Sequence, residues 1–277
     1  MTTNDTLPDL SAEYPVSPAQ AENYRRDGHI LLRNICSREE IAAYGPVITE
    51  SARRRNDDDR PMEERNTFDR AFTLVGGLWN QDENVRRFTL AHRFAKIAAD
   101  LMGVPAVRLY HDVAINKQAG GGYTPWHQDQ FYWPMDTPHT ITMWMPLVDT
   151  TLEMGTLAFA SGSHKTGQLA DEGVSDDAHV HYARVIRERN LPLATAELHA
   201  GDATFHSGWT LHSAPGNASR AAARQIITVV YYADGAYTYA DMSNSAREGD
   251  FRTYMPGVTP GELAVSPLNP LVYGEGV

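Results

Sequence analysis

Apolar positions in the first hundred residues recur at intervals of three and four, which is the period of one helix face. The clearest run comprises Leu90, Phe94, Ile97, Ala98 and Leu101. Gly103 and Pro105 follow this run and are expected to end its helix. The pattern therefore predicts a mainly helical region over about residues 17–105.

Two earlier helix starts in this region carry capping signals. The segment 17–28 begins with Ser-Pro and ends with Gly, and the apolar run HILLRNI at 29–35 after it is typical of a short strand. Ser37 and Glu40 have the spacing of a capping box. Pro46 is expected to kink or divide the helix that this box opens.

From about Val107 the pattern changes to short β-rich runs separated by glycine and proline. The runs are VRLYHDVAIN, TITMWMPLVD, GTLAFAS, ATAEL, DATFHS and RQIITVVYY. Several short strands, with few strong helices between them, predict an antiparallel sandwich or barrel. Residues 175–190 are the exception and are expected to form a helix or an ordered loop.

The two ends of the chain differ from its middle. Residues 1–16 are polar without an apolar period, so we expect a loose tail there. The last twenty or so residues are rich in proline and glycine and are expected to lie on the surface as coil. A length of 277 residues suits one large domain, so we expect 1–277 to form a single unit. Its β core would span about 106–235, and a C-terminal wrap would span 236–277.

Composition and charge exclude several classes of protein. The chain is 42% hydrophobic with a mean hydropathy of -0.43, and it contains neither a long apolar stretch nor a signal peptide. We therefore expect a cytoplasmic protein without a membrane partner. A net charge of -11 disfavours binding to nucleic acid. Cys36 is the only cysteine, which excludes an intrachain disulfide and a cysteine-rich zinc site.

The clearest chemical signal is Trp126-His127-Gln128-Asp129, which follows a glycine-rich stretch. On an extended segment, residues i and i+2 point to the same side, so His127 and Asp129 can face one point while Gln128 faces away. His212, farther along the chain, offers a third ligand. Two imidazoles and one carboxylate leave three adjacent positions of Fe(II) open, which suits a bidentate 2-oxo acid and dioxygen. The pair alone is weak evidence, because His and Asp two apart are common by chance.

A co-substrate with a distal carboxylate would need a fixed cation, and a guanidinium holds a carboxylate better than an ammonium does. Arg224 opens the run RQIITVVYY after His212, where the pleat of a strand would aim its side chain into the barrel. Arg220 is the competing choice. It lies in the preceding loop, where its direction is less determined.

Other residues of these types have simpler interpretations. Four further histidines are expected to be structural or to face solvent, namely His111, His139, His164 and His206. Phe131, Tyr132 and Trp133 could form a wall for the substrate, although consecutive aromatic residues in a β protein are as often part of the core.

At these residues the sequence resembles the phytanoyl-CoA dioxygenase family of Fe(II)- and 2-oxoglutarate-dependent oxygenases, to which ectoine hydroxylase also belongs. The motifs that carry the resemblance are AENYRRDGHILLRNI, INK with WHQD, TMWMPLVD, MGTLAFASGSHKTG, GDATFHSGWTLHSAPGN and RQIIT. They cover most of the chain. The resemblance implies an α+β fold, in which a double-stranded β-helix (a cupin-like jelly roll) carries a mainly helical N-terminal region packed against it.

The resemblance also implies roles for individual residues. His127, Asp129 and His212 would ligate Fe(II), and Arg224 would bind the C5 carboxylate of 2-oxoglutarate. Further residues implied at the co-substrate are Trp144, Ser213 and, more weakly, Lys117 and Thr124. Arg224 lies one residue later, and Ser213 one residue earlier, than in the usual family pattern. One extra loop residue explains the shift of the arginine.

The implied reaction consumes O2 and 2-oxoglutarate, releases succinate and CO2, and hydroxylates an unactivated C–H bond of a small metabolite or natural-product intermediate. Asp129 retains the carboxylate that related halogenases replace, so halogenation is not expected. Few lysines are present, which disfavours an acyl-CoA substrate. We expect a monomer or a homodimer.

Two other classes of protein remain open at this point. One is a zinc hydrolase or isomerase on a cupin-type barrel, which would have no need for the arginine after His212. The other is a non-catalytic jelly roll, in which the three ligands would be accidental.

Overall fold

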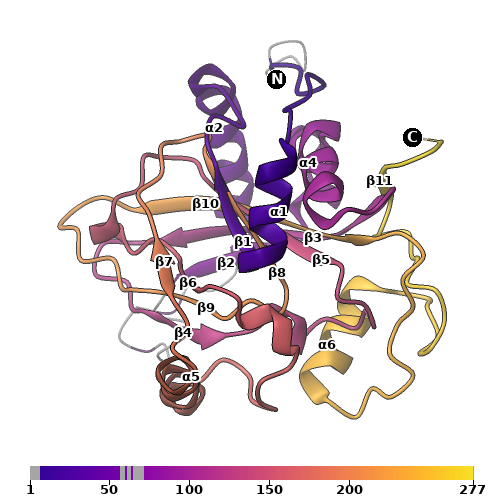
Figure 1. Ribbon diagram of the computed structural model, residues 1–277. Helices are drawn as coiled ribbons and strands as arrows, with labels where there is room; N and C mark the ends of the chain where they lie inside the picture. Colours follow the sequence, from indigo (N-terminus) through magenta and orange to yellow (C-terminus); the bar gives the residue numbers. More distant parts are fainter. Residues whose placement is uncertain (1–6, 57–59, 61–63, 65–71, 277) are drawn as a thin grey trace.

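The structure is a computed structural model that describes residues 7–56, 60, 64 and 72–276, and it combines helices with antiparallel strands (Figure 1). The helices are α1 (Pro18–Asp27), α2 (Arg38–Arg55), α3 (Glu83–Thr89), α4 (His92–Met102), α5 (Asp176–Glu188) and α6 (Ser245–Tyr254). The described residues also form the short 3-10 helices η3 (Leu78–Asn80), η4 (Asp129–Phe131), η5 (Leu152–Met154) and η6 (Ser163–Thr166). None of the helices in the described part is long and apolar enough to cross a membrane.

The strands form two antiparallel sheets. The large sheet has the order β1 (His29–Leu32), β8 (Ala203–Ser207), β5 (Thr140–Pro146), β10 (Arg224–Ala233), β3 (Val107–Lys117) and β11 (Leu271–Tyr273), and β2 (Thr73–Gly76) also pairs with β3. The small sheet has the order β4 (Thr124–His127), β9 (His212–Ala214), β6 (Ala158–Ala160) and β7 (Leu193–Thr195). All of the β-rich runs predicted from the sequence form strands.

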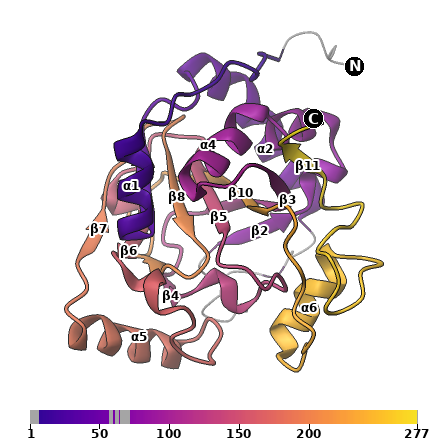
Figure 2. The same cartoon turned by 45° about the vertical axis from the view of Figure 1, so that its right-hand side comes forward.

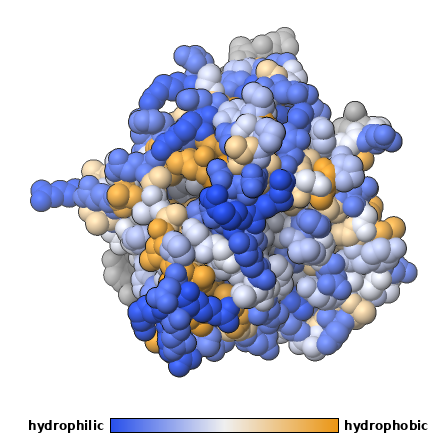
Figure 3. All heavy atoms as spheres, in the orientation of Figure 1, coloured by the Kyte–Doolittle hydropathy of each residue, from blue (hydrophilic) through white to orange (hydrophobic). Residues whose placement is uncertain are grey.

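The helices lie on two sides of the strands. α1, α2 and α4 lie together on one side, and α5 and α6 lie at the opposite end of the molecule (Figures 1 and 2). α4 contacts β3, β5, β10 and β11 of the large sheet. On the face that Figure 3 shows, hydrophilic residues predominate and apolar ones form small groups.

Strand alternation gives the large sheet two different faces. In β5, Ile141, Met143 and Met145 pack into the core that the N-terminal helices share. Thr142 and Trp144, between them, line a cavity on the other face. The sheet therefore separates an apolar core from a cavity with polar walls.

The predicted helix boundaries agree with the observed caps. Ser17 Oγ accepts from Gln20 N at the start of α1, and Gly28 ends that helix with φ 80°. The capping box of Ser37 and Glu40 is present at the start of α2. Gly103 ends α4 with φ 74°. The segment 175–190 contains α5, so of the two predicted alternatives it forms a helix.

The sequence led us to expect that Pro46 kinks or divides its helix, but Pro46 does not divide it. α2 continues through it for 18 residues. Ile41, Tyr44 and Ile48 of this helix are all buried in the core. Their packing outweighs the loss of one backbone hydrogen bond at the proline.

The ends of the chain are more ordered than predicted. In the described part of the expected tail, Leu10 is buried and Pro8 O accepts from the hydroxyl of Tyr44. The Leu10 side chain and the Pro8 carbonyl hold this segment against the core. Neither produces a periodic hydrophobic pattern in the sequence, so the order of the segment was not predicted. Near the C-terminus, β11 pairs with β3 where only coil was expected. Residues 1–6 of the expected tail lie outside the described part.

Candidate metal centre and co-substrate pocket

A cavity of about 520 Å³ lies between the two sheets. Strands β3, β5, β8 and β10 of the large sheet contribute to its wall, and so do β4 and β9 of the small sheet. All three predicted metal ligands and Arg224 line it. A groove of about 540 Å³ between α2 and the outer face of the large sheet contains none of them.

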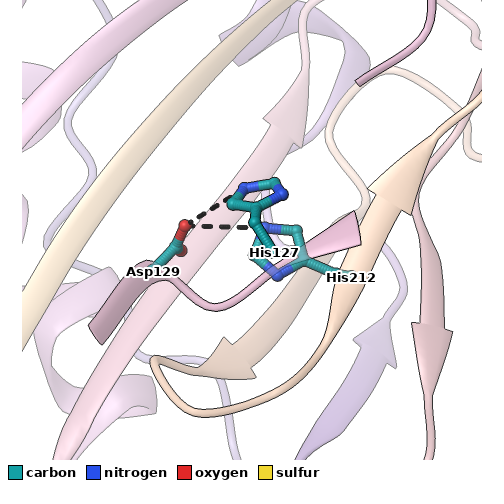
Figure 4. Close-up of side chains that lie close together, drawn as sticks. All are labelled: His127, Asp129 and His212. Atoms are coloured by element: carbon teal, nitrogen blue, oxygen red, sulfur yellow. Dashed lines mark ion pairs between the residues drawn. The ribbon is translucent and has the colours of Figure 1, made fainter. Parts of the chain in front are cut away.

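Strand pairing brings the three predicted ligands together. His127 ends β4 and lies opposite His212 of β9 in the antiparallel register. Asp129 begins the turn η4 directly afterwards. Its Oδ1 lies 3.5 Å from His127 Nε2 and 3.6 Å from His212 Nε2 (Figure 4). One ligand atom from each of the three residues lies within 4.8 Å of the others, so the cluster could hold one metal ion.

Backbone carbonyls set the tautomer of both histidines. His127 Nδ1 lies 2.8 Å from Pro125 O, and His212 Nδ1 lies 3.0 Å from Thr210 O. A carbonyl oxygen only accepts, so each Nδ1 must carry the hydrogen and donate it. The lone pair of each Nε2 is then directed to the centre of the cluster, as metal ligation requires.

The carboxylate of Asp129 has a different set of partners at each oxygen. Oδ2 accepts from Thr142 Oγ1 at 3.1 Å and lies 3.3 Å from His206 Nε2. Oδ1 faces the Nε2 atoms of His127 and His212. Oδ2 is therefore restrained by the protein, and Oδ1 is directed to the place where a metal would bind.

The protonation states of the cluster suit a cation. Burial raises the pKa of Asp129, but positive charge on the facing imidazoles, His212 first, and their hydrogen bonds outweigh burial, so its pKa lies well below the ordinary value. A bound divalent cation would supply this positive charge in place of the imidazole protons. Burial and the proximity of His127 hold the pKa of His212 well below its ordinary value. The carboxylate is thus ionised and His212 is neutral, which are the forms that bind a divalent metal.

Gln128 faces away from the cluster, as the alternation of an extended segment predicts. Its side-chain nitrogen donates to Gly167 O at 2.9 Å and to Trp209 O at 2.7 Å. Its oxygen accepts from Leu169 N at 2.9 Å. These bonds fix the backbone between the two ligands, His127 and Asp129.

Arg224 is a buried cation without an anionic partner in the described part of the chain. Its side chain is the first of β10, and only 2% of the residue is exposed. Nη1 donates to Gly155 O, Nε has no partner, and the guanidinium carbon lies 5.4 Å from the centre of the Trp144 ring. Burial lowers the pKa of Arg224 to about 9. An anion bound in the cavity would supply the missing partner.

The competing arginine has a different environment. Arg220 is exposed and does not line the cavity. The placement therefore favours Arg224 as the anchor of a carboxylate in the cavity.

The other predicted co-substrate residues divide into two groups. Trp144 and Thr124 line the cavity. Ser213 does not, because its strand neighbours on either side face the cavity and alternation turns it away. Lys117 is fully buried beyond the cavity wall and donates to Pro215 O at 3.0 Å. It pairs with Arg224 across the β3–β10 ladder, and burial followed by repulsion from Arg224 lowers the pKa of Lys117 to about 7.

Of the three consecutive aromatic residues, Tyr132 and Trp133 line the cavity, whereas Phe131 packs edge-on against Tyr132 with its ring 5.1 Å away. The wall interpretation therefore suits two of the three. Trp133 also belongs to a buried cluster, so both interpretations apply to it.

Several cavity residues were not recognised from the sequence. His206 was expected to be structural or to face solvent; it is buried, and its Nε2 contacts Asp129. The alternation of β8 could have suggested this position. Asp250 and Tyr254 of α6 and His111 of β3 also line the cavity. Nothing in the local sequence indicates that α6 packs against the sheets.

Comparisons with known proteins agree with this geometry. The sequence profile of the family described as Phytanoyl-CoA dioxygenase (PhyH) matches residues 24–226, a span that contains the three clustered ligands and Arg224. The non-heme alpha ketoglutarate dependent carbocyclase SnoK from nogalamycin biosynthesis has a similar structure, with a TM-score of 0.73 and 22% identity over 92% of this chain and 96% of SnoK.

Two further solved structures are similar. The epimerase SnoN from the same biosynthesis has a TM-score of 0.69 and 25% identity over 91% of this chain and 96% of SnoN. EctD from S. alaskensis, solved with 2-oxoglutarate and 5-hydroxyectoine, has a TM-score of 0.67 and 21% identity over 84% of this chain and 83% of EctD. Structures of these proteins contain iron and 2-oxoglutarate.

Proposed function

The chain belongs to the phytanoyl-CoA dioxygenase family, as its motifs predicted, and we propose that it is an Fe(II)- and 2-oxoglutarate-dependent dioxygenase. Its proposed reaction hydroxylates an unactivated C–H bond of a small metabolite or natural-product intermediate and releases succinate and CO2. One observation carries the proposal: the His-Asp-His cluster lines the same cavity as a buried guanidinium that has no anionic partner among the residues the structure describes.

The residues present suit both absent groups. Two imidazole nitrogens and one carboxylate oxygen form the donor set that ferrous oxygenases use, and both imidazoles already direct an unprotonated Nε2 inward. The buried Nε of Arg224 lacks a partner, and a carboxylate would satisfy it. When bound, Fe(II) and 2-oxoglutarate supply the oxidising chemistry with dioxygen.

The protein itself positions the reactants. Arg224 would hold the distal carboxylate of 2-oxoglutarate, so that the oxo-acid end is directed to the cluster. Trp144 forms a flat wall beside that guanidinium. Thr142 and His206 hold Oδ2 of Asp129, which leaves Oδ1 as the ligand. The remaining cavity would hold the substrate and exclude bulk water.

The outcome of the reaction is part of the proposal. SnoK is named a carbocyclase and SnoN an epimerase, whereas the EctD structure contains the hydroxylated compound 5-hydroxyectoine. For this chain we propose hydroxylation. We also propose that the two sheets form a double-stranded β-helix and that residues 1–277 form a single domain.

The test measures succinate formation under ¹⁸O2 with Fe(II), 2-oxoglutarate and candidate substrates. We expect substrate-dependent succinate and a product that gains one labelled oxygen. A product that loses two hydrogens or isomerises without label would contradict hydroxylation but keep the oxygenase. Substrate turnover that consumes neither O2 nor 2-oxoglutarate would contradict the oxygenase and favour the zinc hydrolase or isomerase.

A further inference from the structure

The cavity carries opposite charges at its two ends. Arg224 pairs with Lys117 in the β3–β10 register, and Val230 pairs with His111 farther along the same two strands. Six residues of a strand span about 20 Å. Arg224 therefore lies at one end of the cavity, and the end marked by His111 lies well away from it.

Besides Asp129 of the metal cluster, one further carboxylate lines the described part of the cavity, on the side of His111. Asp250 of α6 accepts a hydrogen bond from the hydroxyl of Tyr110 through Oδ2, at 2.9 Å. Within the described part of the chain, its Oδ1 has no hydrogen-bond partner and neither oxygen pairs with a lysine or arginine. Burial and, to a smaller extent, repulsion from Asp129 raise the pKa of Asp250 to about 6, although the hydrogen bond from Tyr110 opposes this shift. Among the described residues, this carboxylate therefore has one neutral hydrogen-bond donor and no cationic partner.

Aromatic rings surround the same end. Tyr132, Trp133 and Tyr254 line the cavity together with Asp250. Tyr254 lies one helical turn after Asp250, and its ring lies 4.6 Å from that of His111. Aromatic faces attract cations, and they do so more strongly where water is displaced.

We propose that the substrate of this cavity carries a positively charged nitrogen, an amine or quaternary ammonium, that binds between Asp250 and the rings of Tyr132, Trp133 and Tyr254. The proposal rests on the proposed function, because it treats this cavity as the substrate site. The anionic co-substrate would take the Arg224 end, and the cationic group of the substrate would take the Asp250 end. Each end thus rejects the ligand of the other by charge.

The test compares choline with 3,3-dimethyl-1-butanol, in which a carbon replaces the charged nitrogen. Both are titrated into the full chain without oxygen, with Fe(II) and 2-oxoglutarate present and again with both absent, and binding is followed by ligand-observed NMR. Shape is the same in the two probes, so their difference reports charge. We expect choline to bind about tenfold more tightly than the alcohol.

Variants assign this preference to the site. Asp250→Asn should remove the preference for choline and leave the affinity for the alcohol unchanged. Asp177→Asn is the matched control on the exposed surface of α5 and should preserve the preference. Tyr132→Leu should reduce choline binding, whereas Tyr132→Phe, which keeps the ring, should not. This second pair of variants keeps the test decisive if Asp250→Asn fails to fold.

Equal binding of the two probes would overturn the proposal, and so would a preference that survives Asp250→Asn or is lost equally in Asp177→Asn. Binding of these probes needs no turnover. A chain that prefers choline but never forms succinate would contradict the proposed function alone, and a chain that forms succinate without preferring choline would contradict this inference alone.

Discussion

His206 is the third histidine around Asp129, and its position differs from that of the two ligands. Its Nε2 contacts Oδ2 of Asp129, whereas His127 and His212 face Oδ1. Thr142 donates to the same Oδ2. The carboxylate is thus held by one oxygen and offers the other, so we assign His206 a positioning role.

This role predicts a specific defect in metal binding. His206→Ala should weaken Fe(II) affinity about tenfold, because partners that orient a ligand are typically worth ten- to hundredfold. The measurement is competition with a chelator of known affinity. His139→Ala is the matched control, since His139 is exposed. Unchanged Fe(II) affinity in a folded His206→Ala chain would contradict the positioning role.

Arg224 predicts a defect in 2-oxoglutarate binding. Arg224→Leu should weaken 2-oxoglutarate affinity about ten- to hundredfold, the loss of a buried charge-assisted pair. The thermal midpoint should not fall, because the change removes an unpaired buried charge. Arg220→Leu should bind 2-oxoglutarate normally. If Arg220→Leu carries the defect instead, the anchor has been assigned to the wrong arginine.

The placement of individual site residues could be predicted from the sequence where a short pattern determined the direction of the side chain. The spacing of His127 and Asp129, together with the position of Arg224 at the start of a strand, placed them correctly in the cavity. Ser213 was misplaced relative to the cavity because alternation in β9 turns it away. Asp250 could not be found, because its place depends on how α6 packs against β3.

At the scale of elements, Asp112 connects β3 to the helical layer. On the face of β3 that points away from the cavity, its Oδ2 accepts from Trp79 N at 3.0 Å and from Thr89 Oγ1 at 3.1 Å. Oδ1 has no partner, and the residue is fully buried. η3 and α3 are therefore attached to the sheet through one carboxyl group.

Replacement of this carboxyl should loosen that attachment. Asp112→Ala should lower the free energy of unfolding by about 2–5 kcal/mol, since two buried donors lose their acceptor. Urea unfolding measures the change. Asp136→Asn, at an exposed position, should change stability little. A loss below about 1 kcal/mol in Asp112→Ala would contradict the assigned connection.

The same group predicts a pH dependence of stability. Burial raises the pKa of Asp112 from 3.8 to about 6, although hydrogen bonds from Thr89 and Trp79 oppose this shift. A raised pKa contributes stability that is present below pH 3.8 and is lost as the pH rises through about 6. Between about pH 4 and pH 6, the wild-type chain should therefore lose more stability than Asp112→Asn. Parallel stability curves for the two chains would contradict this effect.

Elements were predictable wherever local chemistry determined their ends. The caps of α1, α2 and α4 follow from residues next to each helix. Neighbouring residues do not predict the continuity of α2 through Pro46 or the pairing of β11 with β3, because both depend on packing with distant segments. Local signals therefore set the boundaries of elements, and tertiary contacts decide the exceptions.

At the scale of the whole molecule, the N-terminal segment secures the helical layer. Leu10 enters the core, and Ala12 O accepts from Arg93 Nε at 2.6 Å. The guanidinium of Arg93 also binds both oxygens of Glu40, so the segment, α2 and α4 are tied together. We infer that residues 7–16 contribute to global stability.

Truncation of the Leu10 side chain tests this contribution. Leu10→Ala should cost about 2–5 kcal/mol of unfolding free energy, the usual effect of a cavity in a packed core. The measurement is urea unfolding. Leu193→Ala, at a residue that is 60% exposed, should cost far less. Equal effects of the two substitutions would show that the N-terminal segment adds little.

The overall charge and the cavity charge have different roles. The chain carries a net charge of -11, yet the cavity holds an unpaired guanidinium at one end. Under the proposed function, a 2-oxo diacid would be recognised by this buried cation rather than by the average field of the surface. The net charge and the inward direction of Arg224 could both be predicted from the sequence, but the absence of an anionic partner among the described residues could be seen only in the fold.

The most direct test of this account is an anaerobic optical titration of the wild-type chain with Fe(II) and 2-oxoglutarate. A bidentate 2-oxo acid on a ferrous ion gives a visible charge-transfer band. We predict that the band saturates at one Fe(II) per chain and is absent from His212→Ala. No band in the wild-type chain, or a band with unchanged affinity in His212→Ala, would contradict the metal centre.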